Sequence, residues 1–534
     1  MAKAKEQNYL HGAFIMTAGV IIMKILGAIY KIPLGNMLGD DGYALFLSAY
    51  YVYSLFLTLA TAGFPVALSR MISAAQAKGK QMQARRIYSV AWWTFFVIGI
   101  ICSAIMFALP EQLADLMNNP DTAMSIRVLS PAVLLCCLAA TYRGLTQGYG
   151  NMTPTTVSQV LDVLVKVAVG LGLAGYLVKH NYDQPVAVAG AIFGVTVGSL
   201  AALIYMIFYK MRNYRFDTVA EPDVPESAGT IFKNLVSIGI PIALGSVVLA
   251  LINLLDSGLC MYRLQNAVGL SYSYAKTLYG VYGKAQTLFN LPAAFITPLT
   301  ISIVPAISAQ IVLKNMHEAG KISEDSLRIS MAIALPMGVG LAVLSEPIMK
   351  IIYPTAHEAG GLLLCLLGIA SVFVCFSLMS TAVLQASGRE KLTLYSIIAG
   401  GVVKIVINWF VIAIPAINIY GAPIGTLCCY ITMCALNLVF ISRSFEGGLS
   451  MKNIFIRPAL PCAIMGVVAY GVYFACGIAV DTTGRMGMLL AMAAAIVIAA
   501  IVYVFAVIKL RAITAEDMKL IPKGDKIAKL LRMK

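Results

Sequence analysis

Charged residues are scarce in this sequence: 12% of its 534 residues are Asp, Glu, Lys or Arg, whereas 60% are hydrophobic. A soluble globular protein is closer to a quarter charged and half apolar. Because the shortage extends along most of the chain, the composition excludes a soluble enzyme with a single membrane anchor. Apolar stretches of about 20 residues recur from end to end, and each is long enough to cross a bilayer as a helix.

Motifs for metal, nucleotide and nucleophilic chemistry are also missing. The 11 cysteines contain no C-x-x-C pair and fall in or beside apolar stretches, so we interpret them as small buried side chains rather than disulfides or metal ligands. The four histidines are scattered and form no H-E-x-x-H motif. Gly283–Lys284 resembles the end of a P-loop but lacks its first glycine and its Ser or Thr. We therefore expect no enzymatic activity, no metal and no cofactor.

The apolar stretches predict an all-α polytopic membrane protein with 14 transmembrane helices. Isolated sheets cannot satisfy their backbone hydrogen bonds in lipid, and the alternating pattern of a membrane barrel is absent. Lys24 interrupts the first stretch and no A-x-A-like cleavage site follows it, so we interpret this stretch as a retained helix rather than a signal peptide. The predicted spans are 9–36, 43–69, 86–109, 128–148, 154–178, 186–209, 234–260, 277–310, 329–349, 360–386, 392–415, 419–441, 458–478 and 486–508. The eighth contains three prolines and should kink.

Basic residues are distributed unevenly around the predicted spans. With both termini in the cytoplasm, 28 of the 39 Lys and Arg residues, Arg143 among them, fall on the cytoplasmic side and 6 fall outside. This bias follows the positive-inside rule and explains the net charge of +15 without nucleic acid as a partner. We expect a multi-pass protein of the bacterial inner membrane, with the basic tail lying along the anionic cytoplasmic leaflet.

The two halves of the chain resemble each other. The segment RGLTQGYGNMTPTTVSQVLDVLVK (143–166) aligns with TAVLQASGREKLTLYSIIAGGVVK (381–404) at an offset of 238, which pairs Lys166 with Lys404. The segment AGAIFG (189–194) aligns with YGAPIG (420–425) at an offset of 231. The glycines of the second pair are four residues apart, a spacing that lets helices approach closely, so we interpret them as packing residues.

The repeat predicts two lobes of six spans in a parallel arrangement, with a site between them and two further helices at the C-terminal end. The predicted domains are an N-lobe (1–211), a cytoplasmic linker (212–231), a C-lobe (232–443), a helix pair (444–511) and a basic tail (512–534).

Five lysines and two aspartates lie inside the predicted spans: Lys24, Lys31, Lys166, Lys284, Lys404, Asp162 and Asp256. An ionisable group deep in lipid costs at least about 2.5 kcal/mol, so it normally faces water or a partner. We predict that Lys24, Lys31, Lys284 and Asp256 line the site between the lobes, with Lys166 and Lys404 as further substrate-binding residues. Two alternatives remain open: Lys31 snorkels to the membrane surface, or Asp162 and Lys166, four residues apart, neutralise each other as an ion pair.

The excess of lysine over acid predicts an anionic cargo. An ammonium group is a compact charge that suits a diphosphate. The inside-negative membrane potential favours outward movement of an anion by about 2.3 kcal/mol per charge per 100 mV. An exporter of cationic drugs would need carboxylates in its cavity, and a polytopic glycosyltransferase would need larger external loops. A purely structural scaffold would not need lysines inside its spans.

Four segments are similar to those of a known family: MKILGAIYKIPLGNMLGDDGYALF (23–46), ATAGFPVALSRMIS (60–73), YRGLTQGYGNMTPTTVSQVLD (142–162) and AEDMKLIPKGDK (515–526). On these segments the chain resembles the multidrug/oligosaccharidyl-lipid/polysaccharide exporter superfamily. Within it, the sequence is most similar to the branch of stage V sporulation protein B and the MurJ-type lipid II flippases. The resemblance covers nearly the whole chain.

The resemblance implies a flippase that works by alternating access, with a central cavity and a groove for a polyprenyl tail formed by the last two helices. It implies cationic cavity residues at Lys24 and Lys284, although the lipid II branch usually has arginines there. The branch also has an Arg-Asp pair where this chain has Tyr30–Lys31, and a helix-2 arginine with no counterpart in 43–69.

The implied cargo is a lipid-linked oligosaccharide, with lipid II for peptidoglycan as the first candidate. Another undecaprenyl-diphosphate-linked polysaccharide, or a drug or other cation carried by a MATE-like exporter, is the alternative. We expect a monomer in the phospholipid bilayer. Coupling to the membrane potential, to H+ or to another ion stays open, as does contact with cell-wall synthesis proteins.

Overall fold

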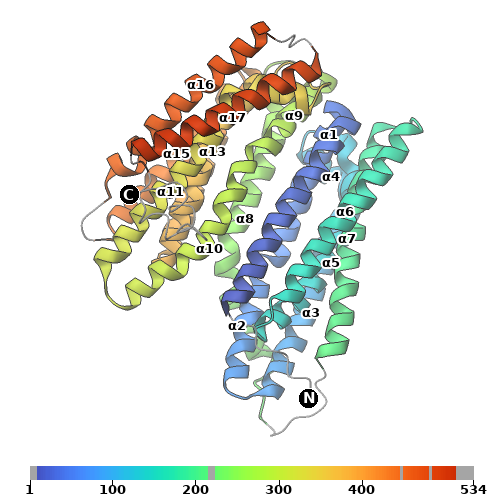
Figure 1. Cartoon of the computed structure of the whole chain (residues 1–534). Helices are drawn as coiled ribbons and strands as arrows, with labels where there is room; N and C mark the ends of the chain where they lie inside the picture. Colours follow the sequence, from blue (N-terminus) through green and yellow to red (C-terminus); the bar gives the residue numbers. More distant parts are fainter. Residues whose placement is uncertain (1–8, 215–222, 446–448, 480–483, 511, 513–534) are drawn as a thin grey trace. The chain divides into compact units, whose positions relative to one another are not determined.

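The computed structural model describes residues 9–214, 223–445, 449–479, 484–510 and 512, and these ranges contain helices and no strand (Figure 1). The predicted all-α class is therefore confirmed. Part of the predicted linker and nearly all of the predicted basic tail lie outside the described residues.

Thirteen stretches of the described chain are long and apolar enough to cross a membrane. The first, Ile15–Ala77, covers most of the predicted span 9–36 and all of 43–69, because α1 (Tyr9–Thr61) joins two helices across a kink within the expected break. Its backbone leaves helical geometry at Gly39, where φ is 69° and ψ is −170°. Glycine adopts this conformation readily because it has no Cβ. The separate count of fourteen spans stays a prediction, with Gly39 as the position that would divide the first two.

The chain divides into two compact units, Met1–Tyr262 and Arg263–Lys534, called unit 1 and unit 2 below. Unit 1 includes most of α8 (Ala228–Asn266), which the predicted domain boundaries assign to the second lobe. Its other segments after α1 are α2 (Phe64–Ala77), α3 (Gln81–Ala108), α4 (Pro110–Leu116), η1 (Pro120–Thr122), α5 (Ala123–Gly148), α6 (Thr153–Lys179) and α7 (Gln184–Asn213).

Glycines allow α6 and α7 to pack against each other at close range. A Cβ added to Gly194 would lie 2.6 Å from Gly170 Cα, and one added to Gly198 would lie 2.8 Å from Asp162 Oδ1. Both distances are too short for a real side chain, so these positions require glycine. The interpretation of the four-residue glycine spacing as packing is confirmed.

Unit 2 contains α9 (Tyr272–Phe289), α10 (Leu291–Val312), α11 (Met316–Val343), α12 (Ser345–Ile352), α13 (Gly360–Ala386), α14 (Glu390–Val411), η2 (Asn418–Tyr420), α15 (Gly421–Ser442), η3 (Lys452–Ile456), α16 (Arg457–Ala479) and α17 (Arg485–Lys509). The predicted kink in 277–310 is confirmed, since helical structure is interrupted at Asn290 between α9 and α10. Pro292 occupies the first turn of α10, where its missing N–H is not needed.

The α14–α15 pair repeats the α6–α7 packing with one exchange. In unit 1, Gly198 on α7 makes room for Asp162 on α6. The offsets of the repeat place Cys429 at the position of Gly198 and Gly400 at the position of Asp162. A Cβ added to Gly400 would lie 3.2 Å from Cys429 Sγ, so the glycine here is on the opposite helix. Where the two helices of each pair cross, a glycine on one helix therefore faces a larger residue on the other.

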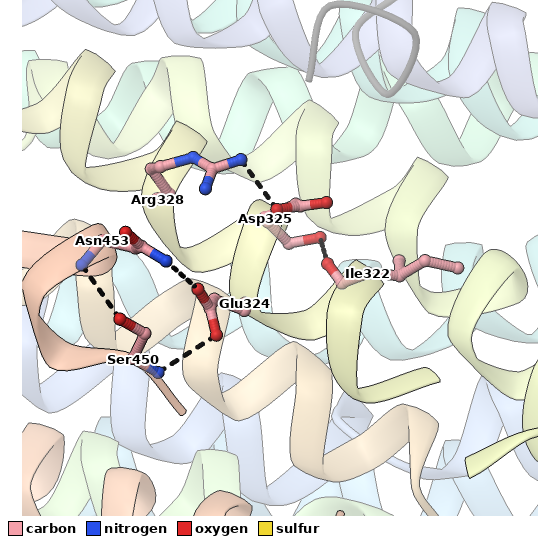
Figure 2. Close-up of polar contacts among 7 residues, drawn as sticks. Ile322, Glu324, Asp325, Arg328, Ser450 and Asn453 are labelled. Carbon is pink, nitrogen blue, oxygen red and sulfur yellow. Dashed lines mark hydrogen bonds and ion pairs between the residues drawn. The ribbon is translucent and has the colours of Figure 1, made fainter. Parts of the chain in front are cut away.

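The C-terminal helices are fixed to the rest of unit 2 by polar contacts (Figure 2). Glu324 on α11 accepts hydrogen bonds from the backbone N–H of Ser450, at 3.0 Å, and from Asn453 Nδ2, at 2.9 Å. The largely buried Arg328 and Asp325 form an ion pair of 2.7 Å on the same helix. The Glu324 carboxylate thus caps the start of the helical segment that continues into α16, where unpaired N–H groups favour a negative charge.

The helices α16 and α17 lie side by side (Figure 1), and α17 makes two hydrogen bonds with the rest of unit 2. The Tyr503 hydroxyl on α17 donates to the Ala332 carbonyl on α11, and Arg485 donates to the Ile351 carbonyl at 3.0 Å. These two contacts hold α17 near both of its ends.

Candidate functional site

The charged residues predicted for the site fall into both units. Lys24, Lys31, Asp162, Lys166 and Asp256 belong to unit 1, and Lys284 and Lys404 belong to unit 2. Lys24 is exposed, the side chains of Lys31, Asp162 and Lys166 are partly exposed, and Asp256, Lys284 and Lys404 are buried. Lys284 is predicted to lie close to Lys24, Lys31 and Asp256. Because Lys284 is in unit 2 and the other three residues are in unit 1, this stays a prediction.

Two lysines of unit 1 lie over tyrosine rings. The Lys31 Nζ is 5.6 Å from the centre of the Tyr50 ring, and the Lys166 Nζ is 5.5 Å from the centre of the Tyr30 ring. An ammonium over an aromatic face gains roughly 0.5–2 kcal/mol, more where water is excluded. These rings hold the ammonium groups in place without neutralising their charge.

Tyr30 is itself held rigidly by three helices. It is 2% exposed, and its hydroxyl donates to the Ala191 carbonyl on α7 at 3.0 Å. Its ring packs against Gly170 on α6, where an added Cβ would lie 2.9 Å from Tyr30 Cε2. The position of the Lys166 ammonium is thus determined by the packing of α1, α6 and α7.

The three lysines of unit 1 lie on two helices that pack against each other. Lys24 and Lys31 are about two turns apart on α1, and Lys166 is on α6, which packs against α1. The charges of Lys24 and Lys166 both act on Lys31, and the three residues are called the lysine cluster below. Asp162 and Lys166 also influence each other, but the ammonium lies over Tyr30 and no direct ion pair joins the two side chains. The single carboxylate of Asp162, beside three ammonium groups, leaves this region with a net positive charge.

Sequence reasoning missed Arg143, which was counted with the cytoplasmic charges. The residue lies in α5, and its Nε donates to Ser158 Oγ on α6 at 2.9 Å. One terminal nitrogen, Nη2, is buried without a hydrogen-bond partner. The signal in the sequence is that Ser158, Asp162 and Lys166 recur every four residues, which places them on one face of a helix.

The two lysines of unit 2 are enclosed by protein. Lys284 on α9 is 0% exposed, and its Nζ lies 5.4 Å from the centre of the Tyr353 ring. Lys404 on α14 is 6% exposed and is electrostatically coupled to Tyr430 on α15. A ligand can reach either ammonium only after the surrounding helices move.

Asp256 is buried on α8 and accepts a weak hydrogen bond from Cys260 Sγ at 3.9 Å, one turn away. No group of three or more His, Cys, Asp or Glu side chains that could hold a metal is found in the part of the chain that the structure describes.

Two family models match the sequence. One, described as polysaccharide biosynthesis protein, matches residues 9–310, which is more than half of the chain. The other, described as MatE, matches residues 241–410.

The chain is similar over nearly its full length to two proteins of Bacillus subtilis (strain 168). It is 27% identical over 522 residues to the "Uncharacterized membrane protein YabM", covering 98% of this chain and 96% of that protein. It is also 27% identical over 530 residues to "Lipid II flippase MurJ", covering 94% and 95%. A solved structure of "Lipid II flippase MurJ, inward closed conformation" has a TM-score of 0.64 at 14% identity, covering 94% of this chain and 99% of that chain. The chain shares the fold of that structure.

Proposed function

Because the chain belongs to the polysaccharide biosynthesis protein family, in the stage V sporulation protein B and MurJ-like branch of its superfamily, we propose that it is a flippase for a lipid-linked anionic glycan. Its direction is from the cytoplasmic to the outer leaflet. The observation that carries the proposal is the lysine cluster: Lys31 and Lys166 lie over tyrosine rings within the apolar helices α1 and α6, and Lys24 lies about two turns before Lys31 on α1.

The chemistry of the cluster fits a diphosphate better than a cation. A diphosphate brings two negative charges to a place where water is scarce, and there the attraction to ammonium groups is stronger than in bulk water. Lys31 and Lys166 are partly exposed and held over tyrosine rings, so they are oriented before the cargo arrives. Orientation in advance reduces the entropy lost on binding.

Alternating access gives the enclosed lysines a role in the cycle. Lys284 and Lys404 are buried in this conformation, whereas the lysine cluster is partly exposed. A rearrangement that opens unit 2 would expose their charges to the head group at a later step of the cycle. The polyprenyl tail would stay in the bilayer, along the apolar surface of α16 and α17.

Lipid II is the first candidate for the cargo, because a relative of nearly equal length carries that function in its name. The lysines in place of the arginines usual in the lipid II branch leave other undecaprenyl-diphosphate-linked glycans as candidates. The match to the MatE model favours a cation exporter as the second candidate.

The test is rescue of cells depleted of their lipid II flippase. We expect the wild-type chain to restore growth and each of Lys31→Met, Lys166→Met and Lys284→Met to reduce rescue strongly at matched expression, since methionine keeps much of the volume but removes the charge. Lys350→Met is the control, because Lys350 lies outside the spans in an exposed ion pair with Glu346.

Rescue by all three variants would contradict the role of the lysines. A wild-type protein that inserts but does not rescue would exclude lipid II as cargo. Resistance of the expressing cells to cationic dyes would then support the cation exporter.

A further inference from the structure

Arg143 has an open hydrogen-bonding position that its neighbours leave unfilled. A guanidinium has five N–H donors in a fixed plane. In this structure Nε is bound to Ser158 Oγ at 2.9 Å, while Nη2 is buried without a partner. A buried charged donor without an acceptor loses its hydration without compensation, so this arrangement favours an incoming acceptor.

The Asp162 carboxylate does not fill the position. Asp162 influences Arg143 electrostatically, yet no hydrogen bond or ion pair joins the two side chains. The Asp162 side chain instead lies against α7 in the space left by Gly198. It therefore moderates the positive charge of Arg143 without occupying its donors.

Through its hydrogen bond to Ser158, the Arg143 side chain lies beside the face of α6 that carries Asp162 and Lys166. Ser158, Asp162 and Lys166 follow each other at four-residue spacing, so the contact of Arg143 with Ser158 lies about 12 Å along the helix from Lys166. Arg143, Asp162 and Lys166 are all partly exposed. Arg143 is five residues from the end of α5, on the side of the membrane predicted to be cytoplasmic.

We propose that Arg143 is a further binding residue for the phosphate groups of the cargo, met before the lysine cluster by a head group that comes from the cytoplasmic side. The proposal rests on the proposed function. Ser158 orients the guanidinium. A local opening around the partly exposed Arg143 brings Nη2, which is buried in this conformation, to a phosphate oxygen, and Asp162 limits the affinity so that the head group passes on to Lys166.

The test is binding of undecaprenyl diphosphate to the full-length protein in lipid nanodiscs. Charge-assisted hydrogen bonds of this kind are worth about 1.5–3 kcal/mol, so we expect Arg143→Gln to weaken binding by about tenfold or more. Arg143→Lys keeps the charge but loses the planar fork, and we expect an intermediate loss. Asp162→Asn should strengthen binding.

The matched control is Arg127→Gln, at the other end of the same helix, where the arginine forms an exposed ion pair with Glu111. It should bind as the wild type does. Thermal unfolding of each variant separates a binding role from a structural one, since a residue that only joins α5 to α6 would change stability and not the affinity of the folded protein.

If folded Arg143→Gln binds undecaprenyl diphosphate with the affinity of the wild-type protein, the proposal for Arg143 is overturned and the proposed cargo is not. If that variant does not fold, Arg143→Lys decides, and wild-type affinity there overturns the proposal. A wild-type protein that does not bind the probe would refute the proposed cargo, and the role of Arg143 with it.

Discussion

At the scale of single residues, the structure shows how lysines are kept in an apolar environment. Three of the five lysines inside the predicted spans, Lys31, Lys166 and Lys284, lie over tyrosine rings at 5.4–5.6 Å. An aromatic face attracts a cation but carries no charge of its own. The ammonium groups are thereby stabilised and remain able to attract an anion, which a direct ion pair with a carboxylate would prevent.

Substitution of Tyr30 separates the ring from its hydroxyl group. Tyr30→Phe keeps the ring under Lys166 and loses the hydrogen bond to Ala191, so its affinity for undecaprenyl diphosphate should stay near that of the wild type. Tyr30→Leu removes the ring, and we expect a loss of roughly 2–30-fold, the equivalent of one cation–π contact. The measurement is a binding titration in nanodiscs. Equal affinities of the two variants would contradict a role for the ring.

The residue scale is also where the sequence was least informative. Lysines within apolar stretches were identifiable because a charge there is rare. Arg143 was not identifiable in this way. A basic residue near the end of a span is counted with the charges of the adjoining loop, whether its side chain points to the loop or to another helix. Its orientation depends on Ser158 of another helix, and tertiary contacts of that kind leave little trace in the local sequence.

At the scale of helices, close packing of α6 and α7 determines where the functional side chains lie. Gly194 contacts Gly170, and Gly170 contacts the Tyr30 ring that carries Lys166. Gly198 leaves the space in which the Asp162 carboxylate lies. The glycine spacing predicted this packing. The break between the first two predicted spans takes the form of a kink at Gly39 rather than a loop, and a single glycine between two apolar stretches is consistent with either.

Gly198→Ala should lower the stability of the helix pair. The new methyl group would lie 2.8 Å from Asp162 Oδ1 and closer still to the backbone of α6, so the helices must separate, at a cost of about 1–3 kcal/mol. The check is the Tm of the purified protein. Gly172→Ala on α6 is the control, because nothing lies within 4 Å of its Cβ position and its Tm should be unchanged or slightly higher. Equal Tm values would show that the contact is not tight.

At the scale of the whole molecule, the membrane topology links the sites to a direction of transport. The positive-inside bias predicts cytoplasmic termini, and it therefore also predicts that the Arg143 end of unit 1 faces the cytoplasm. The helical fold class followed from composition alone. The predicted domain boundaries stay a prediction, and the boundary between the two compact units falls within α8, after Tyr262.

Cysteine labelling at the two ends of α3 tests the direction. Lys80 precedes this helix and Glu111 follows it, and both are exposed. In intact cells, a membrane-impermeant maleimide should label Glu111→Cys and should label Lys80→Cys only after permeabilisation. All 11 native cysteines are buried or partly buried, so background labelling should be low. The opposite pattern would reverse the predicted orientation.

The exchange of residues between the two helix crossings limits which side chains each half can accept. Asp162 faces Gly198 in one half, and Gly400 faces Cys429 in the other. A Cβ at position 400 would lie 2.6 Å from Met433 Cγ and 2.9 Å from the backbone oxygen of Cys429. An acid at this position of the second half would therefore need α14 and α15 to separate, whereas the first half holds its carboxylate with the two helices in close contact.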